Sequence, residues 1–590
     1  MTNDGLEAAQ EGLTALLSVL NVEQVIFVDD FFEEDLNHET VIGWLSEIEE
    51  DVPVQVVEKL GEFDFDNSGV WKRQFIDHWG KLSNNEKKEL ALFVSEALKK
   101  SLKDDRRIDE HLSNLFGKKI LMYSPTKWET AKDKLFKKAT REKKIFCIFD
   151  QDLSLSEGYT AQGSRSGAGL IKEVKENLQD ACICCLLSHT IPSIEYEIRN
   201  WKKLSADNSL ALRDFLPLAK SRLAGDQSPS LLVDGIKKAA LNQYFEDLKK
   251  ITASVIEDSH TRAVNQFQEI DPYDFDLMIL VASYEEGIWE AESLLRIYQI
   301  FHKDEILKSF LNKKNLEAVN KNVLDARRIS SVKIDGVVNN FPQVRPIRRK
   351  ELYQLASSIS YSPLDVGDIF RVGNQNKWFI LLGQPCDLMI RSDGNRKNKF
   401  VNLVKVSRKE KSDLEKWKAK YPDRLPGYLK MHAELSCFFD NTKYLAIVSF
   451  DEILTVSMDM LDLAVLNENG KCEINANEDL EIPTHLTQGW YQRLSSIVNE
   501  YKMLHNRLSE YSKGIKAVDE AIRDSIWKSL MPKVALENSV LPEIPYENGT
   551  FDFKLVRVAR YRQPGASNLL KLYTAYLSRD ADDVDFLKFI

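Results

Sequence analysis

The pattern of apolar and polar residues in the first third of the chain predicts an α/β domain. Short apolar runs alternate there with segments of helical spacing, such as GLIKEVKENL at residues 169–178. Buried strands that alternate with helices are typical of a parallel, doubly wound sheet. We therefore expect a domain of this kind over residues 1–227.

The pattern changes after this domain. Residues 228–330 consist of long helical segments and are predicted to be a helical connector. Residues 331–483 are predicted to be a β-rich domain, with GDIFRV, KWFILLGQP, KFVNLVKV and YLAIVSF as strands. Residues 484–590 are predicted to be a helical part with a terminal β/α tail. The expected fold class is multidomain, α/β + α + β.

Polar side chains follow the apolar runs of the predicted sheet. They are Asp29 and Asp30 after VIFV, Asp150 after IFCIF, Ser188 after CICCLL, and Lys220 after FLPLA. The carboxyl ends of parallel strands meet at one edge, so these side chains are expected to lie together. Crowded carboxylates favour a divalent cation with oxygen ligands, such as Mg²⁺, and a hydroxyl and an ammonium suit a phosphoryl group. The set has what transfer of a phosphoryl group onto an aspartate needs.

This order of residues resembles the receiver domain of two-component response regulators. The receiver pattern D-x-x-L followed by a small residue is met by Asp150, Leu153 and Ser154, and Gly158 follows at a receiver-like interval. The resemblance implies these roles: Asp150 as phosphoacceptor, Asp29 and Asp30 with Asp150 as Mg²⁺ ligands, Ser188 as switch hydroxyl, and Lys220 as partner of the phosphoryl group.

The resemblance covers roughly residues 20–225, and the chain departs from the family within it. The 120 positions from Asp30 to Asp150 are about three times the usual interval, which predicts a helical insertion at about residues 35–140. Four glycines follow Asp150, so Gly169 competes with Gly158 as the residue that opens the next helix.

The lysine and the phosphoacceptor each have alternatives. Lys220 precedes Ser221, where receivers generally have proline after a cis bond, so Lys202 and Lys203 remain alternatives for the lysine. Asp150 is favoured over Asp152 because it directly ends the apolar run. Asp is also common in turns, and a receiver-like fold without phosphorylation therefore stays open.

Composition narrows the class of protein. The 590 residues are 43% hydrophobic and 29% charged, as expected of a globular protein of several domains. No apolar run approaches the ~20 residues of a membrane span, and the N-terminus lacks signal-peptide features. The seven cysteines are odd in number and lie mostly in apolar runs, which indicates neither a disulfide framework nor a zinc ribbon, so a reducing cytoplasm is expected. The net charge of −11 argues against a chain built around nucleic acid.

Other motifs have weaker functional interpretations. GSRSGAG (163–169) lacks the end of a P-loop and is predicted to be a lid over Asp150, with Arg165 able to touch a phosphoryl group. His189 either gates the site or is an ordinary residue at the end of a strand. Cys386 is expected to be a buried structural cysteine rather than a nucleophile. The acidic stretch 285–292 is expected to be a solvated or partner-facing surface.

Two basic segments, PQVRPIRRK (342–350) and residues 391–411, could contact phosphates. A solvated β-surface is favoured for them. The basic residues of the second segment are Arg391, Arg396, Lys397, Lys399, Lys405, Arg408, Lys409 and Lys411.

The resulting functional hypothesis is phosphorylation-responsive signalling, in which Asp150 controls how the C-terminal part engages a protein partner. The chain would be a phosphoacceptor rather than a dedicated enzyme, and a histidine-kinase-like protein would supply the phosphoryl group. Large, atypical receivers of this kind are similar to those of bacterial stress or phage-defence operons. The alternatives are a receiver-gated effector that binds or cleaves nucleic acid, and a scaffold subunit with an inactive receiver fold. The helical connector could support a dimer.

Overall fold

The chain forms two compact units in the computed structural model. The structure describes residues 3–34, 36–46, 68–97, 108–223, 228–337, 341, 343–373, 377–479, 481–482, 486–514, 522, 525 and 546–578. Unit 1 comprises Met1–Arg262 and His302–Asn339, and unit 2 comprises Ala263–Phe301 and Asn340–Ile590.

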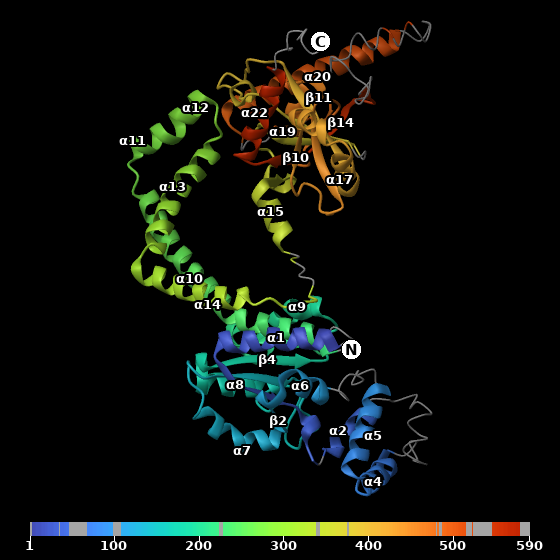
Figure 1. Ribbon diagram of the computed structural model, residues 1–590. Helices are drawn as coiled ribbons and strands as arrows, with labels where there is room; N and C mark the ends of the chain where they lie inside the picture. The colour runs from blue at the N-terminus through green and yellow to red at the C-terminus, as the bar shows by residue number, and fades with distance from the viewer. Residues whose placement is uncertain are drawn as a thin grey trace, which may run out of the picture. The chain divides into compact units, whose positions relative to one another are not determined.

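Unit 1 contains a five-stranded parallel sheet with the order β2-β1-β3-β4-β5 (Figure 1). The strands are β1 (Val22–Val28), β2 (Ile120–Tyr123), β3 (Lys144–Asp150), β4 (Cys182–Ser188) and β5 (Leu216–Ala219). The central strands β3 and β4 are buried almost throughout, which explains why their sequences are continuously apolar. The strand order is the one found in flavodoxin-like doubly wound folds.

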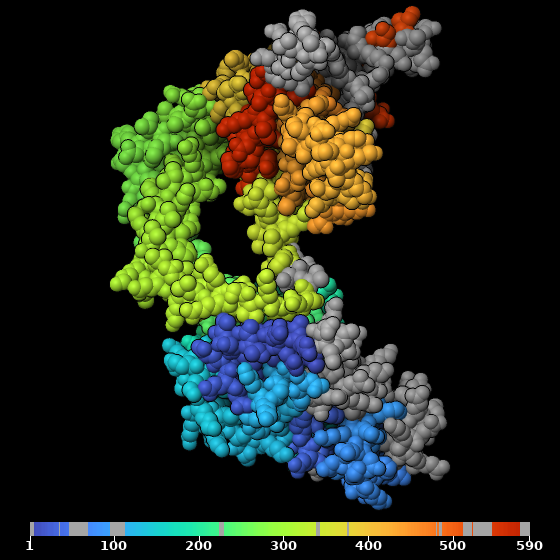
Figure 2. Space-filling view, viewed as in Figure 1, coloured from blue at the N-terminus to red at the C-terminus, as the bar shows by residue number. Residues whose placement is uncertain are grey.

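Helices cover both faces of this sheet. They are α1 (Asn3–Leu20), α6 (Ile108–Phe116), α7 (Pro125–Phe136), α8 (Gly167–Leu178), α9 (Glu197–Asn208), α10 (Ser228–Gln268) and α14 (Lys313–Ser331). Helix α1 lies on one side of the sheet, and α7 and α8 lie on the other (Figure 1). Helix α1 also contacts α14, and the two lie side by side in Figure 2. The second part of unit 1, which lies far away in sequence, thus packs against its N-terminus.

A helical insertion between β1 and β2 has a small core of its own. Its helices are α2 (His38–Ser46), α4 (Ser68–Trp79) and α5 (Asn84–Ala97), and α2 contacts both of the others. The core contains Val41, Phe75, Trp79 and Val94, together with Leu155 from the segment after β3. The buried residues of each helix recur at steps of three or four, as in Trp71, Phe75 and Trp79 of α4, which is the spacing of an amphipathic helix.

The connector helices have a π-helical turn in their middle. After α10 the chain forms α11 (Pro272–Phe275), a π-helix (Asp276–Val281), α12 (Ala282–Glu286) and α13 (Glu290–Phe310). Ser283 on α12 is buried, and its Oγ lies 2.7 Å from Ser293 Oγ on α13. This contact fixes which face of the 272–286 segment is turned inward.

Unit 2 contains a nine-stranded sheet whose pairings are antiparallel. The order is β10-β11-β9-β8-β7-β14-β12, and β6 and β13 both pair with β14. Its strands are β6 (Tyr353–Leu355), β7 (Asp368–Val372), β8 (Trp378–Leu381), β9 (Phe400–Glu410), β10 (His432–Leu435), β11 (Tyr444–Ser457), β12 (Lys471–Asn475), β13 (Tyr546–Glu547) and β14 (Thr550–Tyr561). The four strands predicted from sequence correspond to β7, β8, β9 and β11, and β14 lies in the predicted terminal β/α tail.

The helices of unit 2 complete the core of this sheet. They are α15 (Val344–Leu352), α16 (Pro385–Leu388), α17 (Lys411–Lys420), α18 (Leu425–Met431), α19 (Met458–Leu466), α20 (Gln488–Gly514) and α22 (Gly565–Leu577). Every residue of α19 except Asp459 is buried, which matches its apolar sequence MDMLDLAVL. None of the described helices has the combination of length and apolar character needed to cross a membrane.

Candidate functional site

The ends of four parallel strands place the predicted site residues at one edge of the unit 1 sheet. Val28 is paired with Phe149, so Asp29 and Asp150 directly follow a pair of neighbours in the sheet. Asp150 is in turn paired with Leu187, the residue before Ser188. The neighbouring pair Ser188–Ala219 brings Lys220 to the same edge. Sheet register alone therefore gathers these residues.

Three carboxylates form the centre of this site. One oxygen each from Asp29, Asp30 and Asp150 lies within 4.8 Å of the others. All three residues are buried, with exposed fractions of 5%, 5% and 3%. Burial, together with the charges of Asp29 and Asp150, raises the pKa of Asp30 well above its ordinary value of 3.8. The cluster therefore favours either a proton or a cation.

A buried lysine offsets part of the negative charge. Lys220 Nζ lies 3.0 Å from Asp150 Oδ1, and only 7% and 4% of the two side chains are exposed. Lys220 thus contacts Asp150 even though Ser221 follows it in place of the proline that is usual in receivers. The alternatives from the sequence, Lys202 and Lys203, lie within helix α9 (Glu197–Asn208). Lys220 is therefore the lysine of this site.

Two hydrogen bonds hold the acidic pair in place. Asp29 caps the 3₁₀ turn Asp30–Phe32 by accepting a bond from the backbone N–H of Phe31 at 2.8 Å. Asp30 Oδ2 accepts a bond from the backbone N–H of Leu155 at 2.7 Å. Each carboxylate thus keeps oxygen lone pairs that these bonds do not use.

The donor set fits Mg²⁺. Three carboxylates with one lysine leave excess negative charge in a buried place, and all the candidate ligand atoms are oxygens. Mg²⁺ prefers oxygen ligands and is held in proteins through a few carboxylates and water. Burial and, after it, the charges of Asp29 and Asp150 raise the pKa of Asp30, and a bound cation would oppose that shift.

Ser188 lies at the end of β4, fully buried beside a second hydroxyl. Its Oγ lies 2.8 Å from Thr190 Oγ1 and accepts a bond from the Thr190 backbone N–H at 3.1 Å. Thr190 Oγ1 also lies 3.4 Å from Gln151 Oε1, on the segment that follows Asp150. His189, between the two hydroxyl residues, is half-buried. The hydroxyls connect the ends of β3 and β4.

Close packing fixes the start of α8 against the end of β3. A Cβ on Gly167 would lie 1.8 Å from the backbone oxygen of Asp150, so only glycine fits there. Ser166 caps the helix by accepting a bond from the Gly169 N–H at 3.3 Å. The helix therefore begins at Gly167, and neither Gly158 nor Gly169 opens it as the sequence had suggested.

Arg165 and Asp152 have contacts of their own in this segment. Arg165 is exposed, and its guanidinium lies 5.5 Å from the centre of the Tyr159 ring. Asp152 Oδ1 accepts a bond from the backbone N–H of Ser154 at 3.1 Å. Asp152 is not one of the three residues of the carboxylate cluster, which supports the choice of Asp150.

The segment after Asp150 is tied to the helical insertion. Leu155 is 6% exposed and belongs to the core of α2, α4 and α5. Its carbonyl accepts a bond from the Asn37 N–H at 2.7 Å, and Thr40 Oγ1 donates to the Ser154 carbonyl at 2.5 Å. Because the Leu155 N–H also donates to Asp30, one residue links the carboxylate cluster to the insertion. This role of Leu155 was not predicted from the sequence, although an apolar residue in the polar stretch SLSEG indicates burial against another segment.

Outside the cluster, the carboxylate of Glu33 also links the segment after β3 to other parts of unit 1. Its Oε1 accepts bonds from Ser156 Oγ at 2.9 Å and from the Thr126 N–H at 3.0 Å. Glu33 thereby connects the turn after β1, the loop after β3 and the start of α7. It positions the loop without belonging to the carboxylate cluster.

A buried ion pair fixes the end of β5. Glu197 Oε1 accepts bonds from the Ala219 N–H at 3.0 Å and from Arg222 Nε at 2.6 Å. Arg222 also lies 3.1 Å from Asp234 on α10 and is fully buried. The residues on either side of Lys220 are thus held by one carboxylate.

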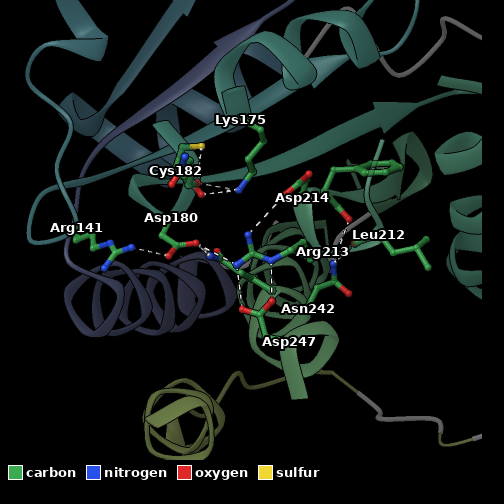
Figure 3. A network of polar contacts seen from close by, with 12 residues as sticks. Arg141, Lys175, Asp180, Cys182, Leu212, Arg213, Asp214, Asn242 and Asp247 are labelled. Atoms are coloured by element: carbon green, nitrogen blue, oxygen red, sulfur yellow. Dashed lines mark hydrogen bonds and ion pairs between the residues drawn. The ribbon is translucent and has the colours of Figure 1, made fainter. Parts of the chain in front are cut away.

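A separate polar network lies at the opposite end of the sheet (Figure 3). Arg213 bonds to Asp180 at 3.0 Å and to Asp247 at 2.8 Å, and Arg141 bonds to Asp180 at 3.2 Å. Burial opposes ionisation of Asp180, but the bonds from Arg213 prevail and lower its pKa. The network borders a cavity of about 320 Å³ whose lining also includes Lys144. Its charges compensate one another and join α10 to the start of β4.

One candidate residue outside unit 1, Cys386, is placed differently from what the sequence indicated. Cys386 is exposed on α16, so the expectation of a buried cysteine is wrong; the reason is that it follows β8 in a short surface helix. Its Sγ lies 3.8 Å from Gln384 Oε1. The other described cysteines are buried, apart from the half-buried Cys437.

Ion pairs and ring contacts engage several residues of the second basic segment. Arg396 is buried against Asp462 at 2.7 Å, and Lys405 pairs with Glu452. The Arg408 guanidinium lies 3.6 Å from the centre of the Tyr444 ring. The two ion pairs offset the charges of Arg396 and Lys405.

Comparison with protein-family models, with curated proteins and with solved structures finds no match to this chain. The functional argument therefore rests on the geometry of the carboxylate edge.

Proposed function

We propose that the chain is a phosphorylation-responsive signalling protein in which Asp150 accepts a phosphoryl group. The observation that carries the proposal is the ion pair between Lys220 Nζ and Asp150 Oδ1 beside the carboxylates of Asp29 and Asp30. These are the positions that the receiver resemblance assigns, and the parallel sheet has the order of flavodoxin-like folds.

The residues support a balanced transfer step. An oxygen of Asp150 forms a bond to phosphorus while the bond between phosphorus and the imidazole nitrogen of a phosphohistidine donor breaks, and the imidazole takes up a proton from water. Lys220 is placed to pair with the new phosphoryl oxygens, and the Ser188 hydroxyl can donate to one of them. Mg²⁺ held by Asp29, Asp30 and Asp150 would supply positive charge to the transferring group.

The link through Leu155 supports a conformational response. A phosphoryl group on Asp150 adds negative charge beside Asp30, whose carboxylate holds the Leu155 N–H. A change in that bond alters the packing of Leu155 in the insertion core. In this proposal the response extends to the C-terminal part, which engages a protein partner, and a histidine-kinase-like protein is the donor.

Beryllofluoride binding tests the proposal without a kinase. The probe mimics a phosphoryl group on an aspartate, and its bound form is detected by fluorine NMR. Wild type with Mg²⁺ should show a bound signal that Asp150→Asn abolishes and Lys220→Ala weakens. The matched control is Asp152→Asn, because Asp152 lies two positions away and outside the cluster. Absence of a bound signal in wild type, or its persistence in Asp150→Asn, would contradict the proposal.

A further inference from the structure

The helical segment 272–286 of unit 2 carries an exposed apolar stripe. Tyr273, Leu277, Leu280 and Tyr284 are the four most exposed of its large apolar side chains, and we call them the stripe. Their exposed fractions are 86%, 59%, 53% and 49%. Neighbouring exposed apolar side chains on a folded surface are typical of a contact site.

The orientation of this stripe is fixed by contacts on the other side of the segment. Ile279 and Ser283 are buried, and Ser283 bonds to Ser293 on α13. Gly287 ends α12 in a left-handed conformation, and a Cβ there would lie 2.3 Å from the Ile390 carbonyl oxygen. The stripe is therefore held outward by a rigid attachment within unit 2.

The stripe lies in an acidic part of the chain, although Arg391 pairs with Glu286 at 3.5 Å. Residues 263–295 contain no lysine or arginine. Their acidic residues are Glu269, Asp271, Asp274, Asp276, Glu285, Glu286, Glu290 and Glu292. We call residues 271–286 the acidic face. An apolar stripe with an acidic rim favours an occupant that is apolar and basic.

Helix α15 of the same unit has the complementary character. Val344 and Ile347 lie on one side of it and are 62% and 63% exposed, and Phe341 just before it is 67% exposed. Arg348 beside them is also exposed, with half of its side chain accessible, and Lys350 follows two positions later. Residues 344–350 of the first basic segment thus lie on an amphipathic helix with a basic, apolar outer side.

The inner side of α15 is anchored, so the outer side is displayed in a fixed direction. Arg345 Nη2 donates to the Phe439 carbonyl at 2.6 Å, and Arg349 pairs with Asp440. The helix runs directly into β6, which pairs with β14. These contacts hold α15 on its own sheet and leave its outer side available to another molecule.

We propose that α15 of one copy docks on the acidic face of a second copy. Unit 2 carries both surfaces, so a two-fold arrangement forms the contact twice, once in each direction. The apolar pair Val344 and Ile347 packs against the stripe, and Arg348 and Lys350 meet the acidic rim. The proposal concerns unit 2 alone and does not depend on phosphorylation of Asp150.

Charge reversal tests this pairing in both directions. Variant A carries Arg348→Glu with Lys350→Glu, and variant B carries Asp276→Lys with Glu285→Lys. Sedimentation velocity of the full chain over a concentration series measures self-association. Wild type should dimerise, more weakly as salt rises, and A or B alone should dimerise at least about tenfold more weakly. A control with Lys313→Glu and Arg328→Glu, on residues of unit 1 that are 89% and 74% exposed, should behave as wild type.

Mixing the variants gives the decisive result. In a heterodimer of A and B, one of the two contacts joins the reversed helix of A to the reversed face of B, so opposite charges meet again there. The other contact keeps the original helix of B and the original face of A. The mixture should therefore dimerise with an affinity near that of wild type. Circular dichroism confirms that each variant is folded.

Three results would overturn the proposal: a monomeric wild type, an unchanged A or B, or a mixture that stays monomeric. A monomeric wild type would assign the acidic face to a basic partner other than this chain.

Discussion

The backbone N–H of Leu155 donates to Asp30 Oδ2 at 2.7 Å while the Leu155 side chain lies in the core of the helical insertion. One residue therefore contacts the carboxylate cluster through its backbone and a second hydrophobic core through its side chain. Leu155 is therefore a direct structural connection between the carboxylate cluster and the core of the helical insertion.

Replacing Leu155 with alanine should destabilise the insertion selectively. Deletion of a buried leucine side chain costs about 2–5 kcal/mol, and Leu155 is 6% exposed. Hydrogen exchange should show faster exchange in α2, α4 and α5 than in wild type, with β3 and β4 unchanged. The matched control is Leu316→Ala, because this leucine of α14 is 40% exposed and its truncation should leave the insertion as it is in wild type. Equal effects on the sheet and the insertion would contradict a selective link.

The raised pKa of Asp30 predicts a pH dependence of stability in the absence of divalent cations. The folded state binds the Asp30 proton more tightly than the unfolded state, so this group lowers the free energy of unfolding as pH rises above about 3.8. Asp30→Asn removes that loss and keeps an acceptor for Leu155. The variant should therefore gain stability over wild type at neutral pH in EDTA, and the gain should vanish below the ordinary pKa. Urea unfolding at several pH values measures this; a loss of stability at neutral pH would contradict it.

Mg²⁺ should stabilise wild type through the same carboxylates. A ligand at a hundredfold its dissociation constant stabilises a protein by about 2.7 kcal/mol. The melting temperature should rise with Mg²⁺ in wild type and in Asp152→Asn. The rise should be lost or much reduced in Asp29→Asn and Asp30→Asn, because each removes one ligand of the cluster. An equal rise in all four proteins would place the cation elsewhere.

Arg222→Ala should destabilise unit 1 strongly. Arg222 and Glu197 are fully or almost fully buried, and removing one partner leaves an uncompensated charge at a cost of about 3–5 kcal/mol. Lys143→Ala is the control, because Lys143 and its partner Glu23 are 59% and 60% exposed. In chemical unfolding, the free energies of unfolding of the two variants should differ by more than about 2 kcal/mol. Similar losses would show that the buried pair is not what holds the end of β5.

The sequence was sufficient to predict which carboxylates lie at this edge of the sheet. Each buried strand is visible as a local apolar run, and the carboxyl ends of parallel strands lie at the same edge. The sequence predicted strands of unit 2 for the same reason. The partners of those residues were not predictable in this way. The Arg222–Glu197 pair and the Leu155–Asp30 bond join segments whose proximity depends on the packing of helices and loops. Likewise, β14 pairs with β7 far away in sequence, as in Leu555 with Val372, and no local pattern indicates that pairing.

Intact-mass analysis after incubation with acetyl phosphate and Mg²⁺ tests the central claim most directly. The account predicts the addition of one phosphoryl group to wild type and to Asp152→Asn, and none to Asp150→Asn. Fragmentation should locate the group on Asp150. Modification of Asp150→Asn to the same extent as wild type would contradict the account, as would an unmodified wild type that also fails to bind beryllofluoride.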